Sequence, residues 1–204
     1  MNKRELRTLL RKRRNDLSPA QRREAARRLR RVAGPLLLRH KRIGFYLAND
    51  GEMDLLHLLN QALWNKRQCF LPVVPERGRR KLWFTLLTGQ AAAWGHNRFG
   101  IPEHWSHHWA RAWQLDLLFM PLVGFDPRGN RLGMGGGFYD ASLAYLRNRR
   151  AWRKPVLAGV AFECQKVDAL PADPWDTPLD LVVTESRCYR FKNRQPEDCP
   201  CATG

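Results

Sequence analysis

Residues 115–125 are almost wholly apolar after Asp116 and lead directly into a glycine-rich segment. A strand of this composition is buried on both faces, as in parallel sheets whose two sides are covered by helices. Glycines follow at positions 129, 133, 135, 136 and 137, and residues 138–149 then show helical spacing. The order strand, glycine loop, helix predicts an α/β protein and restricts the chain to few architectures.

Strands and helices alternate along the rest of the chain. We expect strands at 43–48, 69–74, 82–87, 156–162 and 179–184, and a helix at 54–64. This alternation favours a mostly parallel sheet flanked by helices on both faces. A chain of 204 residues suits a single α/β domain, which we place at residues 1–190. We expect residues 191–204 to be a disordered tail.

Two basic helices are expected at the N-terminus. Leucines at helical spacing predict the first over about 3–15. Ser18 and Gln21 form a capping box around Pro19, and the second helix should end near Gly34 and Pro35. Residues 1–31 hold thirteen Lys and Arg against three acidic residues, which supplies much of the net charge of +17. Such a charge predicts attraction to polyanions, either nucleic acid or substrates that bear phosphates or carboxylates.

Cysteine usage and hydropathy bear on the cellular compartment. The five cysteines have no spacing typical of a disulfide framework or a zinc site. Cys199 and Cys201 could bind a soft metal or act in redox chemistry, but we interpret them as two reduced thiols in the tail. No apolar run reaches the roughly 18–20 residues of a membrane span, and no signal peptide is evident. We expect a cytoplasmic protein.

Residues 88–113 carry four tryptophans and a group of histidines at positions 96, 104, 107 and 108. The histidines invite a metal interpretation. Carboxylate and cysteine partners are few, however, and the spacing matches no site carried by a helix. We therefore expect a loop whose aromatic rings help to close a pocket.

The glycine loop is a candidate phosphate site. Glycines allow backbone N–H groups to approach an anion closely, and the following helix N-terminus adds unpaired donors. The loop is not a P-loop, because no Gly-Lys-Ser/Thr follows, and it does not fit the Rossmann fingerprint. Asp140, just past the loop, could hold Mg²⁺ beside the phosphates or could simply complement the helix dipole.

The string GNRLGMGGGFYD at 129–140, with FMPLVGFD before it, resembles the signature of the 5-formyltetrahydrofolate cyclo-ligase family. The resemblance extends from the basic KRELR at 3–7 to PLDLVVTE at 178–185, and leaves out the tail after about residue 190. It implies an ATP- and Mg²⁺-dependent ligase that converts 5-formyltetrahydrofolate into 5,10-methenyltetrahydrofolate, ADP and phosphate. ATP would be the co-substrate, and the folate could carry further glutamates.

The resemblance also implies roles for particular residues. For ATP binding these are Lys3, Arg4, Arg7, Arg131, Leu132, Gly133, Met134, Gly135, Gly136, Gly137, Phe138 and Tyr139. For the folate they are Leu47, Glu52, Met134, Gly135, Gly136, Gly137 and Phe138, and for magnesium Asp140 and Asp180. Some relatives have Lys or Arg in the loop where this chain has Met134 and Gly136, and many have Tyr in place of Phe138.

The reaction needs an activated amide-like oxygen. We hypothesise that the formyl oxygen attacks the γ-phosphate and that the neighbouring folate nitrogen then closes the ring, which requires positioning and charge neutralisation rather than a protein nucleophile. Accordingly, we assign no catalytic nucleophile. Three alternatives stay open: a nucleic-acid-binding protein, a kinase with another acceptor, and a folate binder without turnover. We expect a monomer without membrane association, and at most weak, non-specific nucleic-acid binding.

Overall fold

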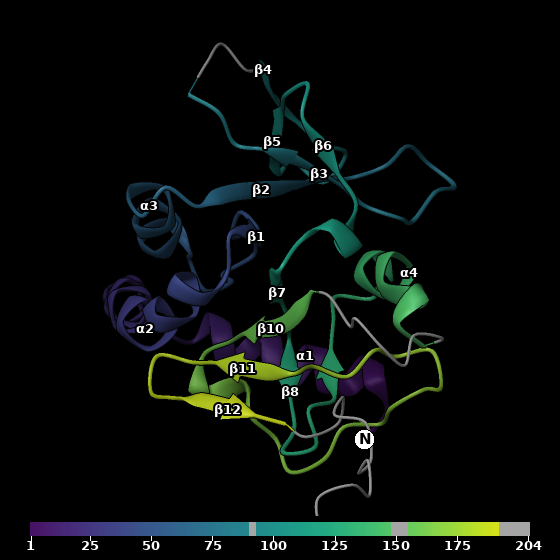
Figure 1. Ribbon diagram of the computed structural model, residues 1–204. Coiled ribbons are helices and arrows are strands. Elements are labelled where there is room, and N and C mark those ends of the chain that lie inside the picture. The colour runs from purple at the N-terminus through teal and green to yellow at the C-terminus, as the bar shows by residue number, and fades with distance from the viewer. Residues whose placement is uncertain (90–92, 148–154, 192–204) are drawn as a thin grey trace, which may run out of the picture.

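A computed structural model describes residues 1–89, 93–147 and 155–191. Their core is an eight-stranded sheet in the order β12-β11-β10-β7-β1-β2-β3-β6 (Figure 1). The strands are β1 (Arg42–Gly44), β2 (Gln68–Val73), β3 (Trp83–Leu86), β6 (Trp109–Ala110), β7 (Leu117–Pro121), β10 (Val156–Val160), β11 (Leu181–Val183) and β12 (Cys188–Arg190).

The five central strands of this sheet run parallel, and the strands at its two edges are antiparallel. The parallel pairs are β11 with β10, β10 with β7, β7 with β1 and β1 with β2. Antiparallel β12 closes one edge, and β3 and β6 close the other. Residues 117–120 of the central strand β7 are fully buried, as a strand covered on both faces requires. The predicted mostly parallel α/β sheet is confirmed.

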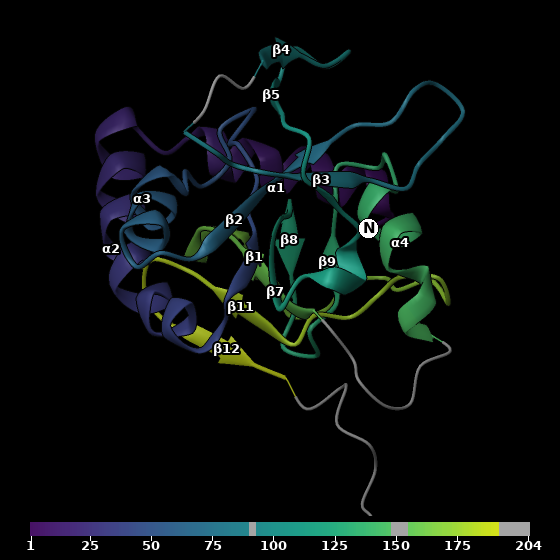
Figure 2. The same cartoon turned by 45° about the horizontal axis from the view of Figure 1, so that its top comes forward.

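Helices cover both faces of the sheet. On one face α2 (Pro19–Arg39) and α3 (Leu56–Trp64) pack on β1, β2, β7, β10 and β11. On the other face lie α4 (Phe138–Leu143) and the 3-10 turns η1 (Ala112–Gln114) and η2 (Ala144–Arg147). Figures 1 and 2 both show the sheet between these two groups. Side chains alternate between the two faces along each strand, so each face of the sheet buries its own hydrophobic cluster under these helices.

The N-terminal helix α1 (Lys3–Asn15) packs against a separate hairpin, β8 (Gly124–Phe125) with β9 (Arg131–Leu132). Leu6 and Leu10 form a buried cluster with Val123, Leu132 and Leu170. At Gly124 an added Cβ would lie 2.4 Å from Leu10 Cδ1, so only glycine allows this approach. The contact brings the basic N-terminus to the start of the glycine loop. The turn η3 (Glu163–Gln165) also contacts α1.

Four predicted elements end well away from their expected last residues, and most of the others differ by one or two residues at an end. The strand expected at 115–125 ends at Pro121, and its last residues pair with β9 instead, because proline lacks the N–H that the ladder needs. The strand expected at 43–48 ends at Gly44, and Tyr46 and Leu47 beyond it line a cavity at the end of the strand. The helix expected over 138–149 is α-helical to Leu143 and then becomes η2; residues 148–149 lie outside the described part.

The second helix does not end near Gly34 and Pro35 but continues to Arg39. Pro35 removes one backbone hydrogen bond, which costs stability inside a helix. Leu36 and Leu37 beyond it are buried in the core against α3 and the sheet, and this burial offsets the lost bond. The tail at 192–204 lies outside the described residues.

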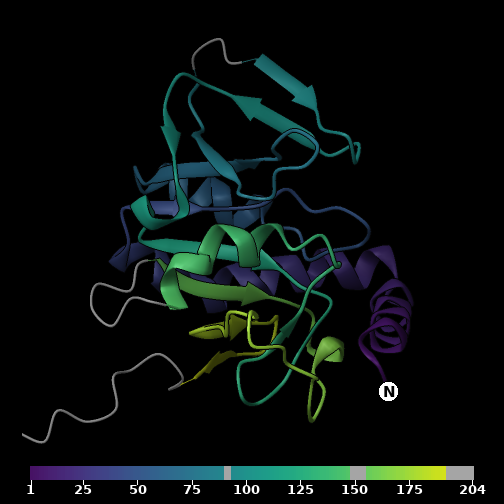
Figure 3. The ribbon, with the colours of Figure 1, turned by 90° about the vertical axis from the view of Figure 1, so that its right-hand side faces the viewer.

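The segment 88–113 is not the loop that we expected. It contains β4 (Ala93–His96) and β5 (Pro102–Trp105), which form a hairpin, followed by β6 and η1. The hairpin stands beyond β3 at the top of Figure 3. His104 is buried against Trp94 with ring centroids 5.1 Å apart. No group of three His, Cys, Asp or Glu able to hold a metal occurs in the described part of the chain.

Among the described residues, no helix combines the length and the apolar character needed to cross a membrane.

Candidate active site

A cavity of about 730 Å³ opens where parallel strands β1, β2 and β7 end. Leu47 follows β1, Val74 follows β2, and Pro121 ends β7. The chain connects β1 to β2 on one side and returns through η1 to β7 on the other side of β1. Such a reversal of strand order leaves a crevice at the carboxyl ends of the strands, where α/β proteins bind ligands.

The glycine loop 133–137 forms one wall of this cavity. Gly135 and Gly137 have φ values of 101° and 66°, which side-chain-bearing residues adopt only with strain. A Cβ at Gly136 would lie 2.8 Å from the Phe138 ring. The following helix α4 has only six residues, so an anion here would depend on loop N–H groups and nearby cations more than on a helix dipole.

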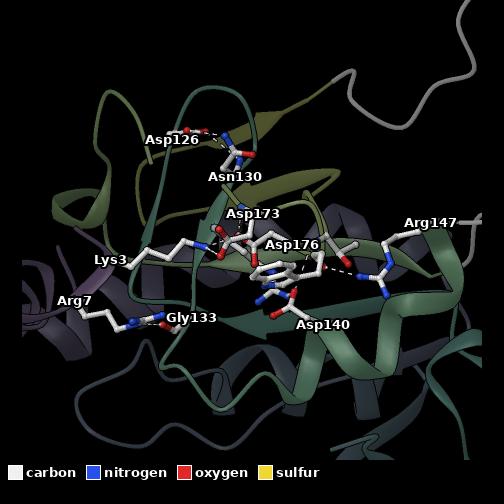
Figure 4. A network of polar contacts seen from close by, with 12 residues as sticks. Lys3, Arg7, Asp126, Asn130, Gly133, Asp140, Arg147, Asp173 and Asp176 are labelled. Atoms are coloured by element: carbon white, nitrogen blue, oxygen red, sulfur yellow. Dashed lines mark hydrogen bonds and ion pairs between the residues drawn. The ribbon is translucent and has the colours of Figure 1, made fainter. Parts of the chain in front are cut away.

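Helix α1 supplies two cations to the same cavity (Figure 4). Arg7 Nε donates to the carbonyl oxygen of Gly133 at 2.8 Å. Lys3 Nζ lies 2.6 Å from Asp173 Oδ2 and 2.7 Å from Asp176 Oδ2. Burial by itself would lower the pKa of Lys3, but its hydrogen bonds to the two carboxylates and their charges raise it overall. Residues more than 160 positions apart therefore share one wall.

Arg131 and Asp140 join the two ends of the glycine loop by an ion pair. The Arg131 side chain is 5% exposed, and its Nε has no hydrogen-bond partner among the described residues. Asp140 Oδ1 also accepts from the backbone N–H of Thr177 at 3.4 Å. A buried guanidinium with a spare donor beside a glycine loop is suited to an anionic ligand.

The acidic side chains of the cavity could hold a magnesium ion if a bound phosphate ligand supplied further oxygen atoms. Asp140, Asp173 and Asp176 line the cavity. Mg²⁺ is commonly held by one or two carboxylates together with substrate phosphates and water, so this donor set fits. Asp180 lies elsewhere: it precedes β11 at the amino edge of the parallel strands, and its Oδ2 accepts from Leu157 N at 2.6 Å.

Glu52 lines the same cavity and lies on the turn that follows β1. Asp50 and Gly51 in this turn have φ values of 49° and 76°. Asn49 N donates to Glu52 Oε2 at 3.1 Å. Burial raises the pKa of Glu52 to about 7, against the lowering effects of the Asn49 hydrogen bond and the Arg14 charge.

Arg14 fixes this turn to helix α1. It is 1% exposed, and its Nη2 donates to the Asp50 carbonyl at 2.6 Å and to Asp50 Oδ2 at 3.0 Å. A buried arginine bound to a backbone carbonyl holds a loop in one geometry. Helix α1 therefore supports two parts of the cavity wall, the Glu52 turn through Arg14 and the glycine loop through Arg7.

Most residues singled out in the sequence line this cavity. They are Lys3, Arg7, Leu47, Glu52, Arg131, Leu132, Gly133, Met134, Gly135, Gly136, Gly137, Phe138, Tyr139 and Asp140. Arg4 and Asp180 are not among its lining residues. Arg4 is exposed near the start of α1, and its backbone N–H donates to Oδ1 of the N-cap residue Asn2.

Sequence reasoning missed several lining residues, among them Asp173, Asp176, Arg80, Phe99 and Arg147. The acidic pair in PADPWD, residues 171–176, is visible in the sequence. The sequence does not show that Lys3 is the partner of these two aspartates, because Lys3 meets them only in the folded chain. Phe99 comes from the segment expected to close a pocket, whereas the four tryptophans of that segment do not line this cavity.

The fold and site define a single-domain α/β enzyme whose ligand cavity, at the carboxyl edge of the sheet, is walled by glycines, cations and carboxylates. Residues 1–185 match the model of the 5-formyltetrahydrofolate cyclo-ligase family, and the chain belongs to this family of ligases. It is 36% identical to 5-formyltetrahydrofolate cyclo-ligase of Haemophilus influenzae over 185 residues, covering 88% of this chain and 96% of that protein.

Three further comparisons are consistent with this assignment. The Escherichia coli K12 5-formyltetrahydrofolate cyclo-ligase is 35% identical over 188 residues, which cover 90% of this chain and all of that protein. The solved structure of Aquifex aeolicus 5,10-methenyltetrahydrofolate synthetase superposes with a TM-score of 0.79 at 29% identity, covering 100% of both chains. A synthetase from Mycoplasma pneumoniae, at 24% identity and a TM-score of 0.68, shares the fold.

Proposed function

We propose that this enzyme converts 5-formyltetrahydrofolate and ATP into 5,10-methenyltetrahydrofolate, ADP and phosphate. Membership of the cyclo-ligase family supports the overall activity. The arrangement of the cavity supports the use of ATP as the co-substrate. Its glycine loop and three cations suit a triphosphate, and the Glu52 turn lies in the wall of the same cavity. The two substrates can therefore meet without leaving the site.

The proposed reaction has two steps. The formyl oxygen attacks the γ-phosphorus, the bond from that phosphorus to the bridging oxygen breaks, and ADP leaves with the electron pair. The neighbouring folate nitrogen then attacks the formyl carbon, loses its proton, and the carbon–oxygen bond breaks to release phosphate. Phosphoryl transfer of this kind depends on alignment and on neutralisation of charge. No serine, cysteine or histidine nucleophile is required.

The glycine loop and the cations would hold the triphosphate. Gly135 and Gly137, with positive φ values, let the loop backbone turn its N–H groups toward phosphate oxygens. Arg131 adds a buried guanidinium with a spare donor. Lys3 and Arg7 are held at the cavity wall by their contacts from α1. Phosphate oxygens would compete with Asp173 and Asp176 for Lys3 and release those carboxylates.

Asp140 would hold a magnesium ion together with phosphate oxygens, and the released carboxylate of Asp173 or Asp176 could complete the set. The ion would neutralise charge on the phosphates during transfer.

Magnesium binding by Asp180 remains a prediction from the family resemblance. Its place at the amino edge of the strands favours a structural role, and an Asp180→Asn variant that keeps its magnesium requirement would support that role.

The folate would occupy the end of the cavity lined by Leu47, Glu52 and Phe138. A carboxylate with a raised pKa can accept a hydrogen bond from a ring N–H or, when protonated, donate one. We propose that Glu52 orients the pterin or the formyl-bearing nitrogen. The aromatic face of Phe138 offers a packing surface for a flat substrate and, lacking a hydroxyl, takes no part in proton transfer.

The reaction can be followed by the near-ultraviolet absorbance of the methenyl product. Purified protein with 5-formyltetrahydrofolate and MgATP should generate it, and omission of either ATP or magnesium should abolish the signal. Asp140→Asn should lower kcat by at least about 100-fold, because charge neutralisation at a transferred phosphoryl group is worth several kcal/mol. Asp16→Asn, at an exposed acid that follows α1 as its C-cap and does not line the cavity, is the matched control.

Three outcomes separate the alternatives. Magnesium- and Asp140-dependent turnover supports the proposal. Folate binding without turnover indicates a folate-binding protein that does not consume ATP. ADP release without the methenyl product indicates a kinase with another acceptor.

We also propose that a single chain is sufficient for activity. Sedimentation of the active protein tests whether it is a monomer. The cytoplasmic location remains a prediction from cysteine usage.

A further inference from the structure

A second cavity, of about 850 Å³, lies beside the active site on the antiparallel edge of the sheet. Val74 and Arg80 line both cavities. Its walls come from the end of β2, the connection to β3, and the tryptophans of β3, β5 and β6. Apart from Val74 and Arg80, the residues of this second cavity have no role in the proposed ligase reaction.

Three partly exposed indoles form one wall of this cavity: Trp83, Trp105 and Trp109 are 38%, 47% and 42% exposed. Trp109 pairs with Thr85, which lies two residues from Trp83, so both indoles project from the same face of the sheet. Their ring centroids are 6.0 Å apart in an edge-to-face arrangement, and Trp105 meets Trp109 in the same way at 6.3 Å. The indoles thereby hold one another in place and leave apolar surface open to solvent.

Cationic side chains line the rest of this cavity. Arg79, Arg80 and Lys81 are exposed on the connection between β2 and β3. Arg111 lies flat on Trp83, with its guanidinium carbon 3.2 Å from the ring centroid. Against these four cations the cavity contains a single carboxylate, Glu76. No ion pair in the described part of the chain neutralises any of the four.

Stacking surfaces beside unpaired cations indicate the chemical class of the ligand. A ligand that carries only charged groups, such as a run of carboxylates, would bind the cations but would not stack on the exposed indoles. Duplex nucleic acid presents phosphates but keeps its bases stacked inside the helix. Single-stranded nucleic acid offers both unstacked bases and a phosphate backbone, and proteins bind it by aromatic stacking beside a basic groove.

We infer that this cavity binds a short single-stranded segment of nucleic acid, with bases stacked on Trp105 and Trp109 and phosphates at Arg79, Lys81 and Arg111. The inference does not rest on the proposed ligase reaction. It gives a role to the tryptophan-rich segment and to part of the net charge of +17, which the folate chemistry leaves unused.

Fluorescence anisotropy of the full-length protein with a labelled oligothymidylate of about 12 nucleotides tests the inference. Trp109→Ala and, separately, Trp105→Ala should each weaken binding at least about fivefold, because base stacking contributes about 1–3 kcal/mol per base. Trp64→Ala is the matched control, since Trp64 is 88% exposed on α3 and lines neither cavity. Far-ultraviolet circular dichroism and the thermal midpoint of each variant report that it is folded.

Salt dependence separates stacking from charge. The double variant Arg79→Gln, Lys81→Gln should reduce the slope of log affinity against log salt by about 1 to 2, because each lost phosphate contact removes about 0.7 on a single strand. The tryptophan variants should leave this slope unchanged. Arg27→Gln with Arg31→Gln, on α2, should leave both slope and affinity near those of the unmodified protein.

Three results would overturn the inference. One is equal affinity for the oligothymidylate and for its duplex with oligoadenylate. Another is competition by a poly-γ-glutamate peptide of the same charge at the same concentration, which would indicate a site that recognises charge alone. The third is unchanged binding in both tryptophan variants, which would leave only general attraction to the basic surface.

Discussion

Glu52 lines the cavity, and its raised pKa follows from its surroundings. The turn at 49–52 places the carboxylate in the cavity wall with one backbone donor, while Arg14 holds the turn from α1. Burial raises the pKa of Glu52 from 4.5 to about 7, so near neutral pH the group exists in both protonation states. The same side chain can then accept or donate a hydrogen bond to a substrate, which is why its pKa matters to function.

Glu52→Gln should change how stability depends on pH. Below about pH 4.5 the carboxyl is protonated in the folded and unfolded chain, and burial carries no charge penalty. As the pH rises toward about 7, the unfolded chain ionises freely while the folded chain must bury the charge, so the unmodified protein loses stability. The glutamine variant should lack this loss, worth roughly 1–3 kcal/mol.

Urea unfolding of both proteins at pH 4.5 and pH 8 measures this difference, with exposed Glu76→Gln as the control. Parallel pH profiles for the unmodified protein and Glu52→Gln would contradict the prediction.

At the scale of elements, the glycine loop and helix α1 build the site together. The loop turns sharply between β9 and α4 because Gly135 and Gly137 take positive φ values. Helix α1 reaches it by packing Leu6 and Leu10 on the β8–β9 hairpin. A strand, a glycine loop and a six-residue helix by themselves would form only part of the cavity wall that we propose to bind phosphate. Lys3 and Arg7, from the first turns of the chain, form another part of it.

Two alanine substitutions in the loop should differ in effect. Gly135→Ala puts a Cβ on a residue with a φ of 101° and should cost at least about 1 kcal/mol of stability, with a clear loss of ligase activity because the loop backbone shifts. Gly133→Ala has ordinary φ, and its Cβ would meet only Arg131 Nη1 at 3.7 Å. It should therefore be nearly neutral for stability.

Thermal unfolding and steady-state kinetics of the two variants provide the comparison. An equal loss of stability in both would mean that φ at Gly135 is not what the loop requires.

At the scale of the whole molecule, the active-site cavity ties together segments from both ends of the chain. Lys3 at the start of α1 meets Asp173 and Asp176 close to the last strands, and Arg7 meets the glycine loop. The adjoining cavity with three tryptophans lies on the antiparallel edge of the sheet. Arg80 lines both this cavity and the active-site cavity. A ligand in the first cavity therefore bridges distant parts of the chain.

MgATP should stabilise the whole molecule. A ligand at about 100 times its Kd adds about 2.7 kcal/mol to the free energy of unfolding, which corresponds to a rise in Tm of roughly 5–10 °C for a chain of this size. At a fixed MgATP concentration, Lys3→Met should show a smaller rise, because it removes one cation from the phosphate wall.

Differential scanning calorimetry with and without MgATP measures the shift. Arg31→Gln, an exposed arginine on α2, preserves the cavity and should keep the full rise. A reduction in Arg31→Gln equal to that in Lys3→Met would indicate that overall charge, and not the site, governs the effect.

The sequence determined the fold class, the element types and most of the cavity wall. Local signals are sufficient for this: the apolar run at 115–121 specifies a buried strand, the glycines specify a loop with unusual backbone angles, and Ser18 with Gln21 specifies a helix start. Periodicity and capping depend on neighbours in the chain, so they can be read without the fold. The long signature around 129–140 made the family recognisable.

Tertiary structure alone decided where elements end and which distant residues meet. The burial of Leu36 and Leu37 carries α2 past Pro35, and pairing with β9 separates Phe125 from β7. The contacts of Lys3 with Asp173, and of Arg14 with Asp50, link positions far apart in the chain. These outcomes depend on packing energies and on contacts across the fold, which a pattern of nearby residues does not contain.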